Sequence, residues 1–260
     1  MPFTELSAAT IHHDQAGDGA PLLVINGTGS DLRNRPNALE WPIAKRHTVL
    51  AYDHRGLGQS TPRDPDHQPT MAEFAADALE LVDHLGWERF AVLGISFGGM
   101  VAQELAISAP ERISHLVLAC TSSGGEGGAS YPLHELYAGP AAERGERYLP
   151  IVDRRHATDP ELLERARTAM AARPMPETVP LGLTRQLEAR RHHDTWERLP
   201  SITCPTFVMY GRHDGIAPPE NSGALARQIP DARLAGYEGG HLFLAQDRTA
   251  WTDLLGFLAE

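Results

Sequence analysis

The sequence predicts an α/β protein in which helices cover both faces of a mostly parallel sheet. Short apolar runs recur along the chain, and longer amphipathic stretches separate them. A strand buried on both faces reads as a continuous apolar run, whereas a helix that covers it shows one apolar stripe. With 260 residues, of which 42% are hydrophobic, the chain can bury a sizeable core, so a disordered protein is excluded.

Several apolar runs are expected to form the sheet. They are Pro21–Asn26, Thr48–Asp53, Phe90–Ser96, His115–Thr121 and Thr206–Gly211. A weaker strand is expected at Ala232–Tyr237. The early segment Phe3–Asp14 is expected to form a short antiparallel hairpin at the edge of the sheet.

Three helices are expected between and after these strands. In the segment Thr70–Gly86 the apolar residues recur at helical spacing, Thr70 with Glu73 forms a capping box, and Gly86 is a stop signal. A second helix should run over Phe97–Ser108 and end before Pro110. A last helix should begin near Thr249.

The segment from residue 122 to residue 202 differs from the rest of the chain. It contains no strand-like run up to Ile202, where strand character returns, but it has helical patterns at Pro160–Ala172 and Leu181–Glu197. We interpret it as a helical cap, inserted into a core formed by residues 1–121 and 203–260. In open parallel sheets ligands bind beyond the carboxyl ends of the strands, so this cap would roof the binding site.

Composition restricts the partners of the protein. The formal charge is −11, which repels nucleic acid and anionic lipid, so no nucleic acid and no membrane partner is expected. No run approaches the ~18 apolar residues of a membrane-spanning helix. We expect a small-molecule substrate, and a homodimer is an open alternative to a monomer.

Two features indicate a cytoplasmic location. The segment Met1–Leu6 lacks the basic and apolar regions of a signal peptide. The cysteines, Cys120 and Cys204, lie in apolar stretches and are expected to be buried free thiols with a structural role.

The run Gly94-Ile95-Ser96-Phe97-Gly98-Gly99 carries the strongest chemical signal. It follows a predicted strand and opens a predicted helix, which is the setting of the G-x-S-x-G nucleophile turn of hydrolases. The turn folds the backbone so tightly that small residues are needed two positions before and after the serine, and Gly94 and Gly98 supply them. Ser96 is therefore the candidate nucleophile.

A serine hydroxyl needs a base and an acid that orients the base. In this turn's setting the partners follow in the order serine, acid, histidine. Asp214 lies directly beyond the strand Thr206–Gly211 and is the candidate acid. His241 follows Gly239 and Gly240 beyond the last strand and is the candidate base.

The reaction also needs N–H donors for a developing oxyanion. The backbone N–H of Phe97, next to the nucleophile, should supply one. The loop after Pro21–Asn26 should supply the second, and we choose the N–H of Thr28. A phosphate-binding interpretation of Gly27-Thr28-Gly29 is weak, because no third glycine or lysine follows at the required spacing.

These motifs resemble those of the α/β-hydrolase fold family over residues 20–121 and 200–260. The stretch from Asp53 to Ser60 is similar to the family's D-x-R-G-x-G-x-S loop, in which Asp53 and Arg55 would be scaffolding. The loop Asn26–Arg33 looks like that of 3-oxoadipate enol-lactonases and related esterases. It carries Asn26 where the commoner pattern has His-Gly-x.

The resemblance implies a cofactor-independent serine hydrolase that cleaves a carboxylic ester or lactone of a small, largely apolar substrate through an acyl-enzyme. A perhydrolase or cofactor-free haloperoxidase is an alternative on the same triad. So is a carbon–carbon bond hydrolase, which ranks lower because Ile95 stands where that group typically has asparagine. A receptor that binds a ligand under the cap without turnover is the alternative from another class.

Four cap residues are candidates for substrate binding, although residues of these types in such a segment are more often packing or solvated groups: Tyr131, His134, Arg190 and Trp196. Two histidine pairs, His12-His13 and His192-His193, each precede an aspartate. Adjacent histidines do not present both rings to one ion, so no metal site is expected. No cofactor is implied either.

Overall fold

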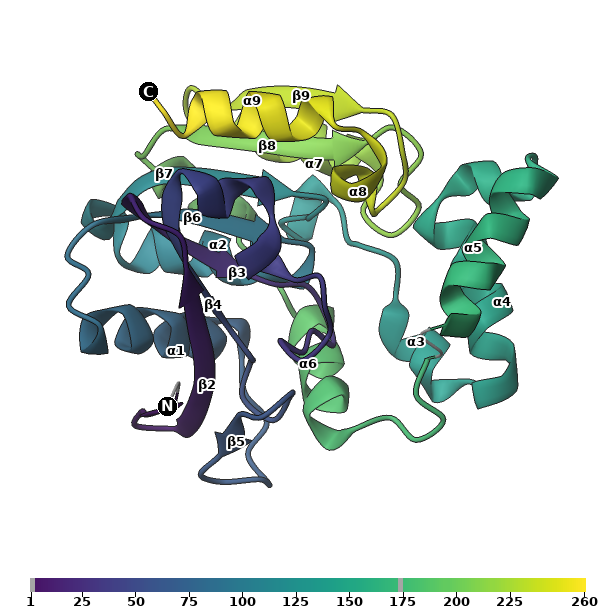
Figure 1. Ribbon diagram of the computed structural model, residues 1–260, viewed down its shortest axis with the longest axis horizontal. Helices are drawn as coiled ribbons and strands as arrows, with labels where there is room; N and C mark the ends of the chain where they lie inside the picture. Colours follow the sequence, from purple (N-terminus) through teal and green to yellow (C-terminus); the bar gives the residue numbers. More distant parts are fainter. Residues whose placement is uncertain (1–2, 173–174) are drawn as a thin grey trace.

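The computed structural model describes residues 3–172 and 175–260, and its centre is a nine-stranded sheet with helices on both faces (Figure 1). The strand order is β1-β2-β4-β3-β6-β7-β8-β9, with β5 paired to β2. All pairs from β4 to β9 are parallel, whereas β2 is antiparallel to β1, β4 and β5. The strands are β1 (Phe3–Glu5), β2 (Ala9–Ala16), β3 (Ala20–Ile25), β4 (His47–Tyr52), β5 (Thr61–Pro62), β6 (Phe90–Ile95), β7 (Ile113–Ala119), β8 (Thr206–Gly211) and β9 (Arg233–Tyr237).

The predicted α/β class, the parallel strands and the antiparallel edge hairpin are confirmed. The apolar runs are buried on both faces because their side chains alternate between two core clusters. In β3, Leu23 and Ile25 pack on one face, and Leu22 and Val24 pack on the other. The first face is covered by α1 (Met71–His84), α2 (Phe97–Ser108) and α7 (Pro219–Gln228). The second is covered by α8 (Phe243–Gln246), α9 (Thr249–Phe257) and the short 3-10 helices Ala38–Glu40 and Pro42–Lys45.

The start of α1 is fixed by the predicted capping box. The Thr70 side chain accepts a hydrogen bond from the Glu73 N–H, and the Glu73 carboxylate accepts one from the Thr70 N–H. The helix ends at His84, two residues before Gly86, whose φ of 72° is easily reached only by glycine. Both boundary signals in the sequence therefore act as expected.

The segment between β7 and β8 is helical, as predicted. It contains α3 (Leu133–Ala138), α4 (Ala141–Val152), α5 (Pro160–Ala172), α6 (Leu181–Arg191) and the 3-10 helices Gly125–Gly127, Arg154–Ala157 and Trp196–Ser201. In Figure 1, α3, α4 and α5 stand beside the carboxyl end of the sheet, and α6 lies below it. Leucines of α3 and α6 form a separate apolar cluster with Leu57 and Ile216 of the core.

Two sequence expectations in this segment are wrong in detail. The helix expected over Leu181–Glu197 ends at Arg191, because the Asp194 side chain accepts a hydrogen bond from the Trp196 N–H and starts a new turn there. Strand character does not return at Ile202. The strand begins at Thr206, just after Pro205, which has no N–H to donate to a neighbouring strand.

No helix within residues 3–172 and 175–260 is both long and apolar enough to cross a bilayer.

The turn between β6 and α2 is built from close backbone contacts. A Cβ atom on Gly98 would lie 1.9 Å from the carbonyl oxygen of Ile25, and one on Gly94 would lie 2.6 Å from the carbonyl oxygen of Gly98. Ser96 between them has a φ of 55°, a value that non-glycine residues seldom adopt. Only glycine at these two positions lets the strand turn sharply into the helix.

We predict that Gly98→Ala lowers the free energy of unfolding by more than about 3 kcal/mol, because the added methyl group overlaps backbone that cannot move away. Gly256→Ala is the matched control, since a Cβ at that position in α9 meets no atom within 4 Å. It should raise stability by about 0.5–1 kcal/mol through helix propensity. Urea unfolding followed by circular dichroism measures both, and equal stabilities would contradict this account of the turn.

Candidate active site

The three residues predicted as nucleophile, acid and base come together at the carboxyl edge of the sheet. Ser96 follows β6, Asp214 lies in the loop after β8, and His241 lies in the loop after β9. The distance from Ser96 Oγ to His241 Nε2 is 2.9 Å, and that from His241 Nδ1 to Asp214 Oδ2 is 2.8 Å. The imidazole can take the proton of the hydroxyl, and the carboxylate stabilises the imidazolium that forms. The hydroxyl oxygen can therefore act as a nucleophile.

Hydrogen bonds to neighbouring groups hold Asp214 and Ser96 in position. Asp214 is fully buried, and its second oxygen, Oδ1, accepts hydrogen bonds from the N–H groups of Ile216 and Ala217 at 2.8 and 2.9 Å. The Ser96 carbonyl accepts a bond from the Thr121 hydroxyl at 2.8 Å. The carboxylate is thus oriented toward the imidazole, and the strained serine backbone is fixed in place.

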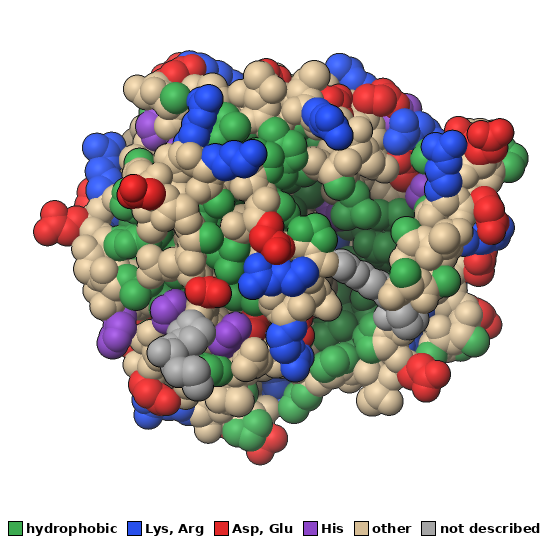
Figure 2. All heavy atoms as spheres, in the orientation of Figure 1, with side chains coloured by type: hydrophobic (Ala, Val, Ile, Leu, Met, Phe, Trp, Pro, Cys, Tyr) green, Lys and Arg blue, Asp and Glu red, His purple; other side chains and the backbone are tan. Residues whose placement is uncertain are grey.

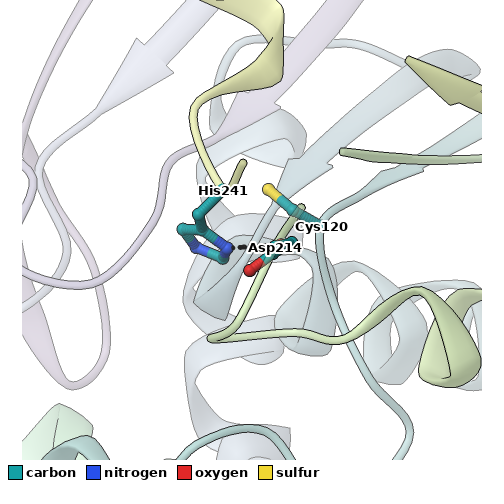
Figure 3. A group of neighbouring side chains, drawn as sticks. All are labelled: Cys120, Asp214 and His241. Atoms are coloured by element: carbon teal, nitrogen blue, oxygen red, sulfur yellow. Dashed lines mark hydrogen bonds and ion pairs between the residues drawn. The ribbon is translucent and has the colours of Figure 1, made fainter. Parts of the chain in front are cut away.

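Cys120 lies beside the acid and the base. Its Sγ, one oxygen of Asp214 and one ring nitrogen of His241 lie within 4.8 Å of one another, and Figure 3 shows that the ring and the carboxylate face each other. Burial, with the nearby Asp214 charge, raises the pKa of the Cys120 thiol. The thiol stays protonated, so it does not compete with Ser96 as a nucleophile. Cys120 and Cys204 are both buried and free, as expected.

The predicted oxyanion donors lie on both sides of the serine. Phe97 opens α2 directly after Ser96, and the loop that contains Thr28 passes close by, since a Cβ on Gly27 would be 3.5 Å from that of Ser96. In the part of the chain that the structure describes, neither the Phe97 nor the Thr28 N–H donates to another group. Both are therefore available to a developing negative charge.

Gln186 of α6 holds this loop from the cap side. It is fully buried, and its Oε1 accepts a hydrogen bond from the Gly29 N–H at 2.9 Å. Sequence reasoning missed Gln186, because 157 residues separate the partners and no local pattern marks a glutamine that bonds to a distant backbone.

Asp53 and Arg55 are scaffolding in the structure. The Asp53 carboxylate, which is fully buried, accepts hydrogen bonds from the Leu32 and Gln59 N–H groups and contacts His12 Nδ1. Arg55 forms a buried ion pair with Asp77 of α1. Neither side chain contacts Ser96 or His241.

A short cap segment bonds to the loops of both the acid and the base. The carbonyl of Ile151 accepts from the Gly215 N–H at 2.9 Å, and that of Val152 accepts from the His241 N–H at 2.6 Å. The Arg154 N–H donates to the His213 carbonyl at 2.9 Å. The end of α4 therefore helps to set where Asp214 and His241 lie.

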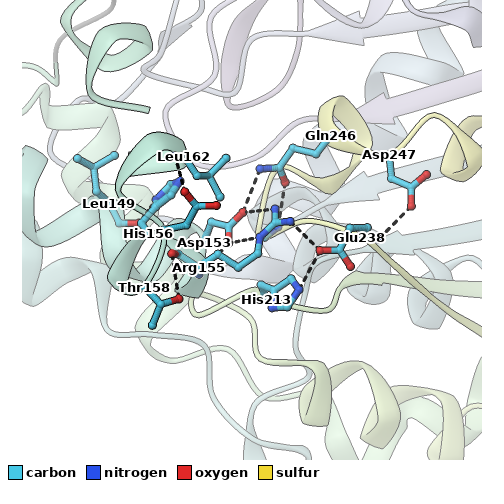
Figure 4. A network of polar contacts seen from close by, with 12 residues as sticks. Leu149, Asp153, Arg155, His156, Thr158, Leu162, His213, Glu238, Gln246 and Asp247 are labelled. Carbon is cyan, nitrogen blue, oxygen red and sulfur yellow. Dashed lines mark hydrogen bonds and ion pairs between the residues drawn. The ribbon is translucent and has the colours of Figure 1, made fainter. Parts of the chain in front are cut away.

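Side chains continue this contact, as Figure 4 shows. Asp153, buried at the end of α4, accepts two bonds from the Arg155 guanidinium and one from Gln246 of α8. Arg155 also donates to Glu238, three residues before His241, at 2.6 Å. These residues were not predicted, because nothing in the local sequence distinguishes Asp153 from an ordinary surface carboxylate.

The structure brings together three of the four candidate substrate-binding residues. Tyr131, His134 and Arg190 line one cavity between the cap and the core. Trp196 does not join them, since it packs against the large core cluster beneath the sheet. We therefore do not assign Trp196 a role in binding.

Apolar surface approaches the candidate site from the other side. A pocket of about 610 Å³ reaches His241 and is lined mostly by apolar groups, among them Ile95, Leu242 and Trp251. Figure 2 shows a hollow between the cap helices and the rest of the molecule, with hydrophobic side chains over much of its wall. The surroundings suit an apolar substrate.

Comparisons with known proteins agree with this geometry. Residues 20–247 match the family model described as alpha/beta hydrolase fold. The chain is 31% identical to "Putative carbamate hydrolase RutD" of Azorhizobium caulinodans, with 100% of this chain and 99% of that protein covered. It is 31% identical to rhodomycin D methylesterase DnrP of Streptomyces peucetius, with 89% of each covered. The enol-lactonase structure from Burkholderia xenovorans LB400 superposes with a TM-score of 0.82 and 25% identity over 100% of both chains.

We predict that Asp153→Asn lowers kcat about threefold to tenfold and the free energy of unfolding by about 1–3 kcal/mol, because the charged bonds to Arg155 are weakened. Arg154→Met is the control, since this exposed side chain can be replaced without loss of the backbone bond to His213. Steady-state kinetics and urea unfolding at neutral pH measure both. An unchanged kcat in Asp153→Asn would show that the cap segment does not position the acid and base.

The stability difference should also depend on pH. Although burial opposes it, hydrogen bonds from Arg155 hold the pKa of Asp153 below its usual value of about 3.9. A lowered pKa contributes stability above the unfolded value, and this contribution is lost as the pH falls through the folded value. The difference between wild type and Asp153→Asn should therefore shrink below about pH 4. A difference that stays constant down to pH 3 would contradict this.

Proposed function

The chain belongs to the α/β-hydrolase family, and on that premise we propose that it is a cofactor-independent serine hydrolase of a carboxylic ester or lactone. The single observation that carries the proposal is the hydrogen-bonded chain from Ser96 Oγ through His241 to Asp214. The enol-lactonase and methylesterase among its relatives act on the same type of bond.

In the proposed reaction His241 Nε2 takes the proton of Ser96 as Oγ attacks the carbonyl carbon of the substrate. The N–H groups of Thr28 and Phe97 stabilise the oxyanion, and Asp214 stabilises the imidazolium. His241 then gives its proton to the leaving alkoxide, and an acyl-enzyme remains. Water, activated by His241, releases the acid and restores the serine.

The apolar walls near His241 support a small, largely apolar substrate. We also propose that residues 122–202 act as a cap domain on a core formed by residues 1–121 and 203–260. A cytoplasmic location stays a prediction from the sequence, which fractionation would test. A homodimer stays an open alternative to a monomer, which light scattering would test.

We predict that Ser96→Ala abolishes hydrolysis of 4-nitrophenyl acetate and removes covalent labelling by a fluorophosphonate, because no other described nucleophile is hydrogen-bonded to His241. Asp214→Asn should lower kcat by about 10⁴, as the loss of the orienting carboxylate does in serine proteases. Ser108→Ala, at the far end of α2, is the matched control and should leave the rate unchanged. Residual turnover by a folded Ser96→Ala protein would refute the proposal.

Two further assays separate the alternative functions. Peroxide-dependent bromination that exceeds ester hydrolysis would favour a perhydrolase. Ligand binding with neither turnover nor an acyl-enzyme in mass spectrometry would favour a receptor.

A further inference from the structure

A cavity of about 130 Å³ lies between the cap and the core, close to the candidate active site but without any of its three residues in the wall. We call it the cationic cavity. Its wall carries Arg190, Arg191, His134 and His193 together with Ser122 and Ser130, whose hydroxyl groups are hydrogen-bonded to each other, and none of the described residues in the wall has a carboxylate side chain. Its volume is several times the ~30 Å³ that a water molecule occupies in the liquid, so it can hold a carboxylate group.

Arg190 is the unusual member of this wall. Its side chain is only 7% exposed, and Nη1 donates to the Tyr131 carbonyl at 2.8 Å. The remaining edge of the guanidinium, formed by Nε and Nη2, has no hydrogen-bond partner. A buried cation that is left partly unpaired carries a cost in desolvation free energy. A ligand that pairs with this edge would remove that cost.

Other arginines in the protein show which partner suits this edge. Arg155 uses Nε and Nη2 to hold both oxygens of Asp153, at 3.0 and 2.7 Å. Arg33 holds Asp31 with the same two nitrogens, at 3.0 and 2.6 Å. A carboxylate matches the two parallel N–H groups of this edge.

Charge in the cavity favours an anion. Burial lowers the pKa of Arg190 to about 10, so the guanidinium still carries its charge at pH 7. Burial also lowers the pKa of His193 to about 4, so that ring is neutral. The site therefore offers the buried positive charge of Arg190 beside the neutral ring of His193.

Backbone contacts link the cavity to the candidate acid. The Tyr131 carbonyl accepts from Arg190, and the Tyr131 N–H donates to the Ile216 carbonyl at 2.7 Å. Ile216 in turn donates its N–H to Asp214 at 2.8 Å. One residue, Tyr131, thus separates the guanidinium from the loop that carries the acid, and Arg190 lies near enough to Asp214 for the two charges to interact.

We propose that Arg190 binds a carboxylate of the substrate in the cationic cavity, and that the substrate is a half-ester of a dicarboxylic acid or a lactone with a free carboxylate. The inference rests on the proposed function and narrows its substrate class. Arg190 selects the substrate and takes no part in the proton transfers.

The test compares monomethyl succinate, glutarate and adipate with methyl butyrate, valerate and hexanoate, which have the same chain lengths without the charge. We expect wild type to show a kcat/KM at least tenfold higher for one or more half-esters than for the matched neutral ester. In Arg190→Met this ratio should fall at least tenfold, mainly through KM, and Arg190→Lys should restore part of it.

Arg167→Met is the control for loss of a cap arginine, since Arg167 lies exposed on α5, paired with Glu146. It should keep the wild-type ratio. A wild type without preference for any half-ester, or a preference that survives in Arg190→Met, overturns the inference.

A second measurement does not depend on turnover. Calorimetry with glutarate and adipate should show binding to Ser96→Ala, and affinity at least tenfold lower when Arg190→Met is added. Equal affinity with and without Arg190 overturns the inference. Failure of the proposed function shows up separately, as hydrolysis that survives in Ser96→Ala alone.

Discussion

Direct contact between backbone segments at the end of β6 is the constraint on which the candidate site depends. Gly98 lies against the Ile25 and Asn26 carbonyls, and Gly27 lies against Ser96. The turn that carries the serine and the loop that carries the second oxyanion donor therefore touch without side chains between them. Their relative position is set when the central strands pair, before any substrate arrives, and such preorganisation is what stabilises a developing charge effectively.

The acid and the base depend on a different support. Asp214 and His241 follow strands β8 and β9, toward one end of the sheet, on loops that the core alone does not enclose. The cap segment at Ile151–Asp153 bonds to both loops, and Gln186 of α6 bonds to the oxyanion loop. The inserted helices are thus part of the framework that holds the loops of the site.

The sequence allowed prediction of whatever depends on local pattern. The strands, the capping box at Thr70 and the turn around Ser96 each carry a short-range signal, and chain order then selected Asp214 and His241 from many acids and 13 histidines. Gln186 escaped because its partner is distant along the chain, and Asp153 escaped because nothing in the local sequence distinguishes it from an ordinary surface carboxylate. The short helices α3 and α8 escaped as well, since brief helices gain their stability from packing and show little periodicity of their own. Trp196 packs against the core cluster and does not line the cavity with the other three candidates, and the sequence alone does not show which way such an aromatic side chain faces.

Two buried arginines, Arg55 and Arg190, differ in whether their charge is paired within the protein. Arg55 is paired with Asp77 in the core, so its charge is neutralised when the chain folds. Among the described residues, Arg190 has one hydrogen-bond partner, a backbone carbonyl, and the unpaired edge of its guanidinium retains a desolvation cost. If Arg190 acts as proposed, a carboxylate that pairs with this edge removes that cost. A neutral ester gains nothing from it, so discrimination follows from the protein's own unpaired charge.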